Sequence, residues 1–213
     1  MPRRTLIASI GAASLLSLAA SCTETEAPAT EPPPAPAVGR APATDAERAA
    51  VSQARAAAQH LGRMLKTRLL EAMQQGPARA ARVCSEEAQA LTARAATERN
   101  ARVGRSSLRL RNEANEGPEW VRAWLRRHGE RPAEGVAPAS GIAAEPPVAR
   151  FVAPIAIEGP CLACHGERTG IPEEVRSLLA ERYPRDRATG YALGDLRGAL
   201  WAEVPVASAR AAE

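Results

Sequence analysis

Two cysteines and a histidine are the residues of this sequence best suited to chemistry: Cys161, Cys164 and His165. Two thiols separated by two residues can each add to a vinyl group of haem, and the next residue then lies beneath the iron as an axial imidazole. The same residues could form a redox dithiol, half of a zinc site or a structural disulfide. A redox dithiol is typical of a βαβ unit and a zinc site needs a second pair of ligands, and the sequence indicates neither. We therefore expect one covalently bound haem c, attached through both cysteines, with His165 as the proximal iron ligand.

Five residues have side chains that could ligate the opposite face of the iron, which accepts a thiolate, an imidazole or a thioether. They are Cys84, His60, His128, Met64 and Met73. Cys84 is the best placed, because it lies on the inner face of a predicted helix where Ala80 and Ala88, one turn away on either side, leave room for a flat porphyrin. Free cysteine is also among the residue types most often buried for packing alone, so both interpretations stay open. We expect His60 to be a boundary histidine of a long amphipathic helix, His128 to lie at a solvated helix end, and the methionines to pack in the core.

Arginines alternate with apolar residues over 103–111, as in a strand with one polar face. The arginines of that face are Arg105, Arg109 and Arg111. They could hold haem propionates, because an arginine fork suits a carboxylate, or they could form a solvated strand face, which we favour slightly. Three other polar residues are interpreted as turn and cap residues without a chemical role: Asp186, Asp195 and Arg197.

The first 21 residues have the anatomy of an export signal. Arg3 and Arg4 give a positive start, a short apolar stretch follows, and small residues precede Cys22. We expect residues 1–21 to be a bacterial lipoprotein signal peptide and Cys22 to carry the lipid. This interpretation places the protein in the periplasm, anchored to a bacterial membrane. An ordinary cleaved signal peptide and a chance apolar start are the alternatives.

Composition divides the rest of the chain. Residues 22–43 are rich in Pro, Ala, Thr and Glu, which predicts a disordered tether. We expect residues 44–208 to form one haem-carrying domain and residues 209–213 to be a flexible tail. Only 3% of the residues are aromatic, which favours a porphyrin as a filler of the interior and an apo protein that folds poorly. The net charge of +4 is modest and the chain is exported, so we expect no nucleic-acid partner.

Hydrophobic periodicity predicts helices first and strands later. Thr44 and Glu47 predict a capping box that opens a long helix ending near Gly76. Pro77 predicts the start of a second helix, which would continue to about residue 95. The remaining expected elements are a strand over 103–111, a short helix around 120–125, a loop over 129–147, a strand over 151–157, a helix after Pro172 and a strand over 200–206. This order predicts an α+β fold with an antiparallel sheet flanked by N-terminal helices.

Several segments together resemble the single-haem c-type, PAS-like domain family, long labelled a domain of unknown function. They are residues 82–85, 103–115, 161–166, 183–191 and 194–199. The resemblance implies a PAS-like fold with a central antiparallel sheet, and an iron held between His165 and Cys84. It also implies a sensory role, since family members occur as modules attached to signalling domains. This sequence carries no kinase, cyclase or helical transmitter, so a lipid-anchored domain would signal through a protein partner or pass electrons itself.

Three functions are compatible with these features. The first is a periplasmic haem protein that senses redox state or a small gas through ligand exchange at Cys84. The second is a single-haem electron-transfer cytochrome with a closed, six-coordinate iron. A haem enzyme such as a peroxidase is the least supported, since the sequence shows no acid–base group placed for peroxide chemistry. We therefore expect no enzymatic activity.

Overall fold

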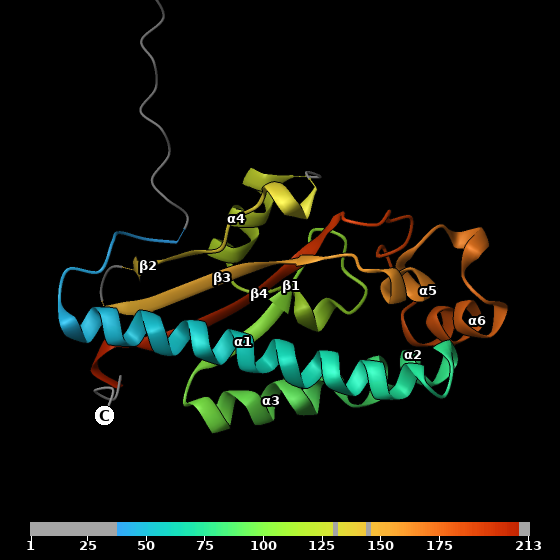
Figure 1. Cartoon of the computed structure of the whole chain (residues 1–213), viewed down its shortest axis with the longest axis horizontal. Helices are drawn as coiled ribbons and strands as arrows, with labels where there is room; N and C mark the ends of the chain where they lie inside the picture. The colour runs from blue at the N-terminus through green and yellow to red at the C-terminus, as the bar shows by residue number, and fades with distance from the viewer. Residues whose placement is uncertain (1–37, 130–131, 144–145, 209–213) are drawn as a thin grey trace, which may run out of the picture. The chain divides into compact units, whose positions relative to one another are not determined.

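The computed structural model describes residues 38–129, 132–143 and 146–208 (Figure 1). In these residues four strands form one sheet in the order β1-β4-β3-β2, and neighbouring strands are antiparallel. The strands are β1 (Arg102–Ser106), β2 (Ala139–Ala143), β3 (Val148–Ala156) and β4 (Leu196–Pro205). The predicted α+β class with an antiparallel sheet is confirmed. The expected signal peptide, Cys22, most of the expected tether and the C-terminal tail lie outside the described residues.

Two helices cover opposite faces of the sheet. Helix α1 (Asp45–Met73) lies along one face (Figure 1), where its buried alanines pack against Phe151 of β3. Helix α4 (Glu119–His128) packs Trp124 into the cluster on the other face, together with Trp201 of β4. Side chains alternate between the two faces of a strand, so β3 and β4 contribute to both clusters. Small side chains on α1 bring the helix close to the sheet.

Helices α2 (Pro77–Glu86) and α3 (Ala88–Arg99) replace the single helix that we expected there. The break falls at Glu87, where the backbone departs from regular helical geometry at φ −107°. The carboxylate of Glu87 accepts two hydrogen bonds from Arg68 of α1, at 2.6 and 2.8 Å, which fix the junction against α1. Cys84 therefore lies in the last turn of a short helix.

Strand β1 is shorter than expected, because Ser107 ends it. The Ser107 hydroxyl donates to the carbonyl of Arg197 at 2.8 Å and accepts the backbone N–H of Arg109 at 3.1 Å. Such local side-chain bonds compete with the strand ladder. Arg109 and Arg111 consequently lie in the following loop, and the predicted strand over 103–111 is wrong in its second half.

The structure also corrects one loop prediction and the bounds of one predicted strand. Strand β2 lies inside 129–147, which we expected to be a loop. Its small residues let the backbone of Gly39 approach β2 closely, since a Cβ atom at Gly141 would lie 2.9 Å from that backbone. Strand β4 begins earlier than expected, and Gly198, which resembles a turn residue, lies within it opposite Ile155.

Residues 38–43 are part of this fold, although we expected them in the tether. The backbone of Arg40 exchanges two hydrogen bonds with that of Ile142 in β2, at 3.1 and 2.8 Å. The guanidinium of Arg40 also pairs with the carboxylate of Glu47. The capping box between Thr44 and Glu47 is confirmed. This segment therefore extends the sheet beside β2.

The chain after β3 forms two further helices, α5 (Leu162–His165) and α6 (Glu173–Arg182). Helix α6 follows Pro172, as predicted, and packs Val175 against Ala81 of α2. Among the residues that the structure describes, no helix combines the length and the apolar character needed to cross a bilayer.

Replacing Gly198 by alanine should lower the free energy of unfolding by about 1–3 kcal/mol, the usual cost of overpacking. The added Cβ would lie 2.2 Å from the backbone oxygen of Ser106 in β1. Urea unfolding followed by circular dichroism measures the difference. Gly135→Ala is the matched control, because nothing lies within 4 Å of its Cβ position. Equal midpoints for the two variants would contradict the close approach of β1 and β4.

Candidate functional site

The loop after β3 carries the cysteine–histidine motif. Cys161 ends a turn of 3-10 helix, and Cys164 and His165 lie on α5. The loop is anchored at its start by buried Ile157, whose backbone N–H donates to the carbonyl of Asp195 at 2.9 Å. The motif is therefore held against the segment that leads into β4.

The imidazole of His165 is fixed in one orientation. Its Nδ1 lies 2.7 Å from the carbonyl oxygen of Ala188. A carbonyl oxygen only accepts, so Nδ1 carries the proton and Nε2 keeps the lone pair that a metal ligand needs. Burial, together with nearby Arg197 and Arg111, lowers the pKa of His165 well below its ordinary value. His165 is therefore the neutral imidazole.

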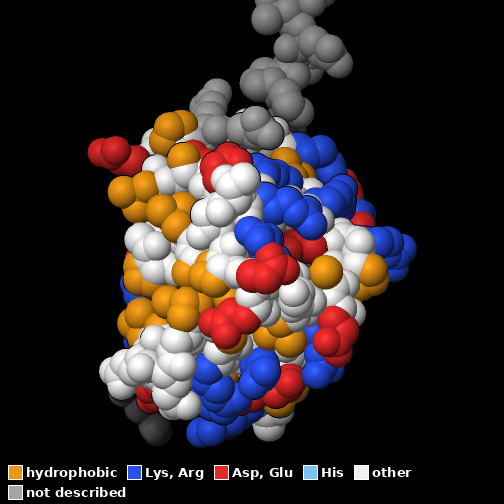
Figure 2. All heavy atoms as spheres, turned by 90° about the vertical axis from the view of Figure 1, so that its right-hand side faces the viewer, with side chains coloured by type: hydrophobic (Ala, Val, Ile, Leu, Met, Phe, Trp, Pro, Cys, Tyr) orange, Lys and Arg blue, Asp and Glu red, His pale blue; other side chains and the backbone are white. Residues whose placement is uncertain are grey.

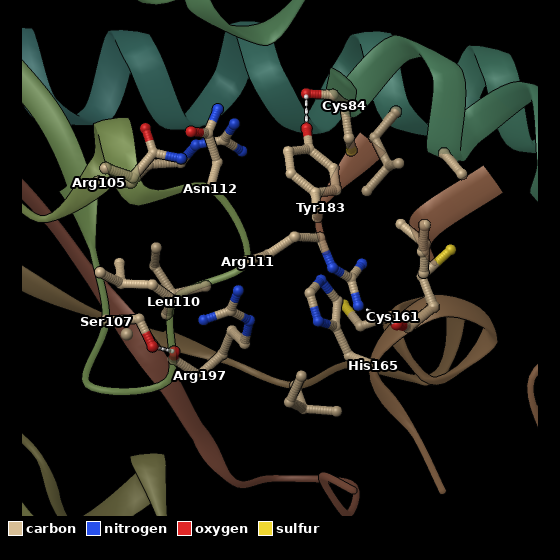
Figure 3. A pocket seen from close by; sticks show the side chains of 18 of the residues that line it. Cys84, Arg105, Ser107, Leu110, Arg111, Asn112, Cys161, His165, Tyr183 and Arg197 are labelled. Carbon is tan, nitrogen blue, oxygen red and sulfur yellow. Dashed lines mark hydrogen bonds between the residues drawn. The ribbon is translucent and has the colours of Figure 1, made fainter. Parts of the chain in front are cut away.

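His165 lines a cavity of about 210 Å³ that the close-up in Figure 3 shows. Cys161 and Cys164 line it beside the histidine, and Cys84 reaches it from α2. Its apolar lining includes residues from α1, β3, the loop after β3 and α6: Leu69, Met73, Ile155, Ile157 and Leu179. The structure thus brings together the four residues that the sequence analysis placed at the iron.

A second cavity of about 650 Å³ adjoins the first. The two cavities share Cys84, Arg105, Ile155 and Cys161 among their lining residues. Helix α1 contributes both apolar and polar residues to the second cavity, and Leu65, Leu69 and Leu70 are the apolar ones. Cys84 and Cys161 therefore lie where two largely apolar spaces meet.

The thiols of Cys84, Cys161 and Cys164 are all free. Burial raises the pKa of Cys164 to about 11, although nearby Arg111 opposes the shift. A reactive dithiol has a lowered thiol pKa, so this environment disfavours the redox-dithiol interpretation. Among the residues described, no group of three or more His, Cys, Asp or Glu side chains is placed to hold a metal ion.

Cys84 is held in place by contacts between α2 and α6. Its carbonyl oxygen accepts a hydrogen bond from the hydroxyl of Tyr183, which follows α6, at 3.4 Å. Ala81, three residues before Cys84, is 3% exposed and packs against Leu179 of α6. The position of the sulfur therefore depends on how α2 and α6 pack.

The structure separates most of the other candidate ligands from this cavity. His60 of α1 lies 2.7 Å from Glu98 of α3, His128 ends α4, and Met64 packs in the core beside the sheet. None of these three lines the cavity. Met73 does line it, so its thioether is the remaining alternative to Cys84.

Arg111 and Asp186 hold the cavity wall together. The Arg111 guanidinium donates to Asp186 at 2.9 Å and to the carbonyl of Cys164 at 2.5 Å. The Asp186 carboxylate also accepts the backbone N–H of Ala188 at 2.8 Å. The sequence analysis missed this role, because an aspartate in a polar segment resembles a turn residue. In the sequence, the only indication of a role for Asp186 is that it lies within 183–191, one of the segments that resemble the family.

The structure distributes the other arginines between the cavity and its surroundings differently from our expectation. Arg109 does not line this cavity: it donates to backbone carbonyls, and its guanidinium lies 4.1 Å from the ring centroid of Tyr191. Arg105 of β1 does line it, as does Arg197 at the start of β4. Burial lowers the pKa of Arg197. Arg197, to which the sequence analysis gave no chemical role, thus joins Arg105 and Arg111 at the cavity.

Comparison with known proteins agrees with the sequence pattern. A crystal structure of the cyanobacterial heme-protein Tll0287 is similar to this one at 23% sequence identity and a TM-score of 0.46, covering 55% of this chain and 69% of the other. No curated protein matches the sequence. A family model described as Tll0287-like matches residues 42–205, well over half of the chain. The protein therefore belongs to the Tll0287-like family.

Proposed function

We propose that this protein binds one haem c in the cavity between α5 and α2. Cys161 and Cys164 form the thioether bonds, and His165 and Cys84 ligate the iron. The convergence of these four residues on one cavity carries the proposal. The description of Tll0287 as a heme-protein supports haem as the ligand.

The residues of the site suit each part of that attachment. The apolar lining shared by the two cavities suits a porphyrin. Each S–H adds across one vinyl group, so that the sulfur bonds to one vinyl carbon and the hydrogen ends on the other. The free thiols of Cys161 and Cys164 meet this requirement. Nε2 of His165 is free to ligate, because Nδ1 is already bound to a carbonyl.

We infer that the protein senses redox state or a small gas. Bound haem supplies an iron that changes oxidation state and can bind diatomic molecules. A Cys84 thiolate donates electron density to ferric iron, and protonation or reduction weakens that bond. The second cavity, of about 650 Å³, gives the thiol space to move. Through Tyr183 and α6, such a movement reaches the surface of the domain.

Electron transfer without sensing is the second candidate function. The ring of Tyr191 contacts the edge of His165, with centroids 6.3 Å apart and planes at 83°. Tyr191 is 6% exposed and is covered by Arg109. Through this aromatic contact, Tyr191 continues from His165 in the direction away from the cavity. An iron that stays closed to carbon monoxide would favour this function.

The fold, location and partners belong to the same proposal. The single antiparallel sheet supports a PAS-like domain. The pattern of residues 1–22 supports a periplasmic lipoprotein anchored through Cys22. A signalling or redox protein partner is part of the same proposal.

Wild-type protein made together with a haem-maturation system should keep its haem on a denaturing gel. The Cys161→Ser/Cys164→Ser variant should lose it, because hydroxyl groups form no thioethers, and should melt at a lower temperature, because the cavity loses its filling. Haem staining and thermal melts measure both effects. Met64→Leu is the control, since Met64 lies outside the cavity. If wild-type protein made under these conditions carried no haem, that result would contradict the proposal.

Cys84→Ala should raise the reduction potential, on the order of 100 mV, since axial ligands set haem potentials over about 0.8 V. Loss of the thiolate should also let carbon monoxide bind the ferrous protein at least about tenfold more tightly, a change of about 1.4 kcal/mol. Spectroelectrochemistry and carbon monoxide titration measure these changes. If Met73→Leu produced them and Cys84→Ala did not, Met73 would be the ligand.

Cys22→Ala should release the protein from the membrane fraction and abolish incorporation of labelled palmitate, because the alanine cannot be acylated. Fractionation of cells grown with the label measures both. Persistent membrane association in that variant would contradict anchoring through Cys22.

A further inference from the structure

The cavity that lies between His165 and Cys84 carries more positive charge than its own residues neutralise. Arg105, Arg111 and Arg197 line it, and no aspartate or glutamate does. Arg111 is paired with Asp186, which lies just behind the wall. Among the ion pairs of the residues described, none involves Arg105 or Arg197. Two cations at the cavity are therefore left without a carboxylate.

The hydrogen bonding of these two arginines is also incomplete. The Nε atoms of Arg105 and Arg197 are both buried, and neither has a hydrogen-bond partner in the described part of the chain. Arg197 donates through Nη1 to the carbonyl of Arg109 at 3.3 Å. Burying a charged donor without a partner is costly unless a ligand supplies the acceptor. Two such donors indicate a ligand that brings two negative charges.

The position of the two arginines agrees with the covalent structure of haem. The macrocycle carries its two vinyl groups on one side and its two propionates on the other. Thioethers at Cys161 and Cys164 would therefore direct the propionates away from α5. In Figure 3, Arg105 and Arg197 both lie away from Cys161, and Arg197 is the nearer of the two to His165. They project from the paired strands β1 and β4.

We propose that Arg105 and Arg197 bind the two propionate carboxylates of the haem, one arginine to each. This assignment rests on the proposed haem function. A guanidinium donates two parallel N–H bonds to a carboxylate, so both unpartnered Nε atoms gain acceptors. The amide of Asn112, beside Arg105 in Figure 3, supplies a further donor at the same side. Arg111 is excluded because its charge is already paired with Asp186, and its Nε and Nη2 atoms donate to Asp186 and to two carbonyls.

The test is the reduction potential of haem-loaded Arg105→Gln and Arg197→Gln, measured from pH 5 to pH 8. Without its cation, a partly buried propionate should bind a proton at least about tenfold more tightly, a shift of one pH unit. The potential should therefore fall at pH 8 and rise as the pH is lowered, with a steeper dependence than in the wild type. Arg105→Lys and Arg197→Lys should restore most of the wild-type curve, since they restore the charge.

Arg109→Gln is the matched control, because Arg109 lines no part of this cavity. It should lower the melting temperature and leave the curve of potential against pH unchanged. Wild-type curves for both cavity variants, or the same change in Arg109→Gln, would overturn the assignment while the haem spectrum still supported the proposed function. If one glutamine variant does not fold, the other decides: a lower potential at pH 8 with a steeper dependence on pH supports the assignment, and a wild-type curve contradicts it.

Discussion

Antiparallel pairing of β3 with β4 is the constraint on which the site depends. The register places Ala156, where β3 ends, opposite Leu196, where β4 begins. The loop that leaves β3 and the segment that enters β4 must therefore start from the same end of the sheet. They bind each other through their main chains, at Ile157 and Asp195 and again at His165 and Tyr191. The segment before β4 also contains Ala188, whose carbonyl oxygen orients the imidazole of His165.

Local signals were enough to predict much of this architecture. Cys161, Cys164 and His165 lie together on one loop because they are neighbours in the sequence, and the capping box joins Thr44 to Glu47, three residues later. The helix after Pro172 has both a start signal and an apolar face. Each of these features depends on residues within one or two turns of each other, which is why the sequence alone could predict them.

The features that sequence reasoning missed all depend on residues far apart in the chain. The helix break at Glu87 depends on Arg68, and the end of β1 depends on a hydrogen bond from Ser107 to the backbone of Arg197. Strand β2 looks like a loop because its small residues accommodate residues 39–40. Arg197 lies at the cavity because β4 begins at Leu196, earlier than its sequence pattern predicts. Such contacts leave no periodic pattern in the sequence.

Cys84 lies on a helix that is bounded at both ends by departures from helical geometry. Gly76, before α2, has φ 103°, a value that few residues other than glycine adopt. Glu87, after α2, interrupts the regular helical geometry between α2 and α3. The ten residues between them form one short rigid helix, which the Arg68–Glu87 ion pair holds against α1 at its C-terminal end. A displacement of the Cys84 sulfur can therefore move this helix about the bend at Gly76. Helix α6, which packs on α2, is the element that would register that movement first.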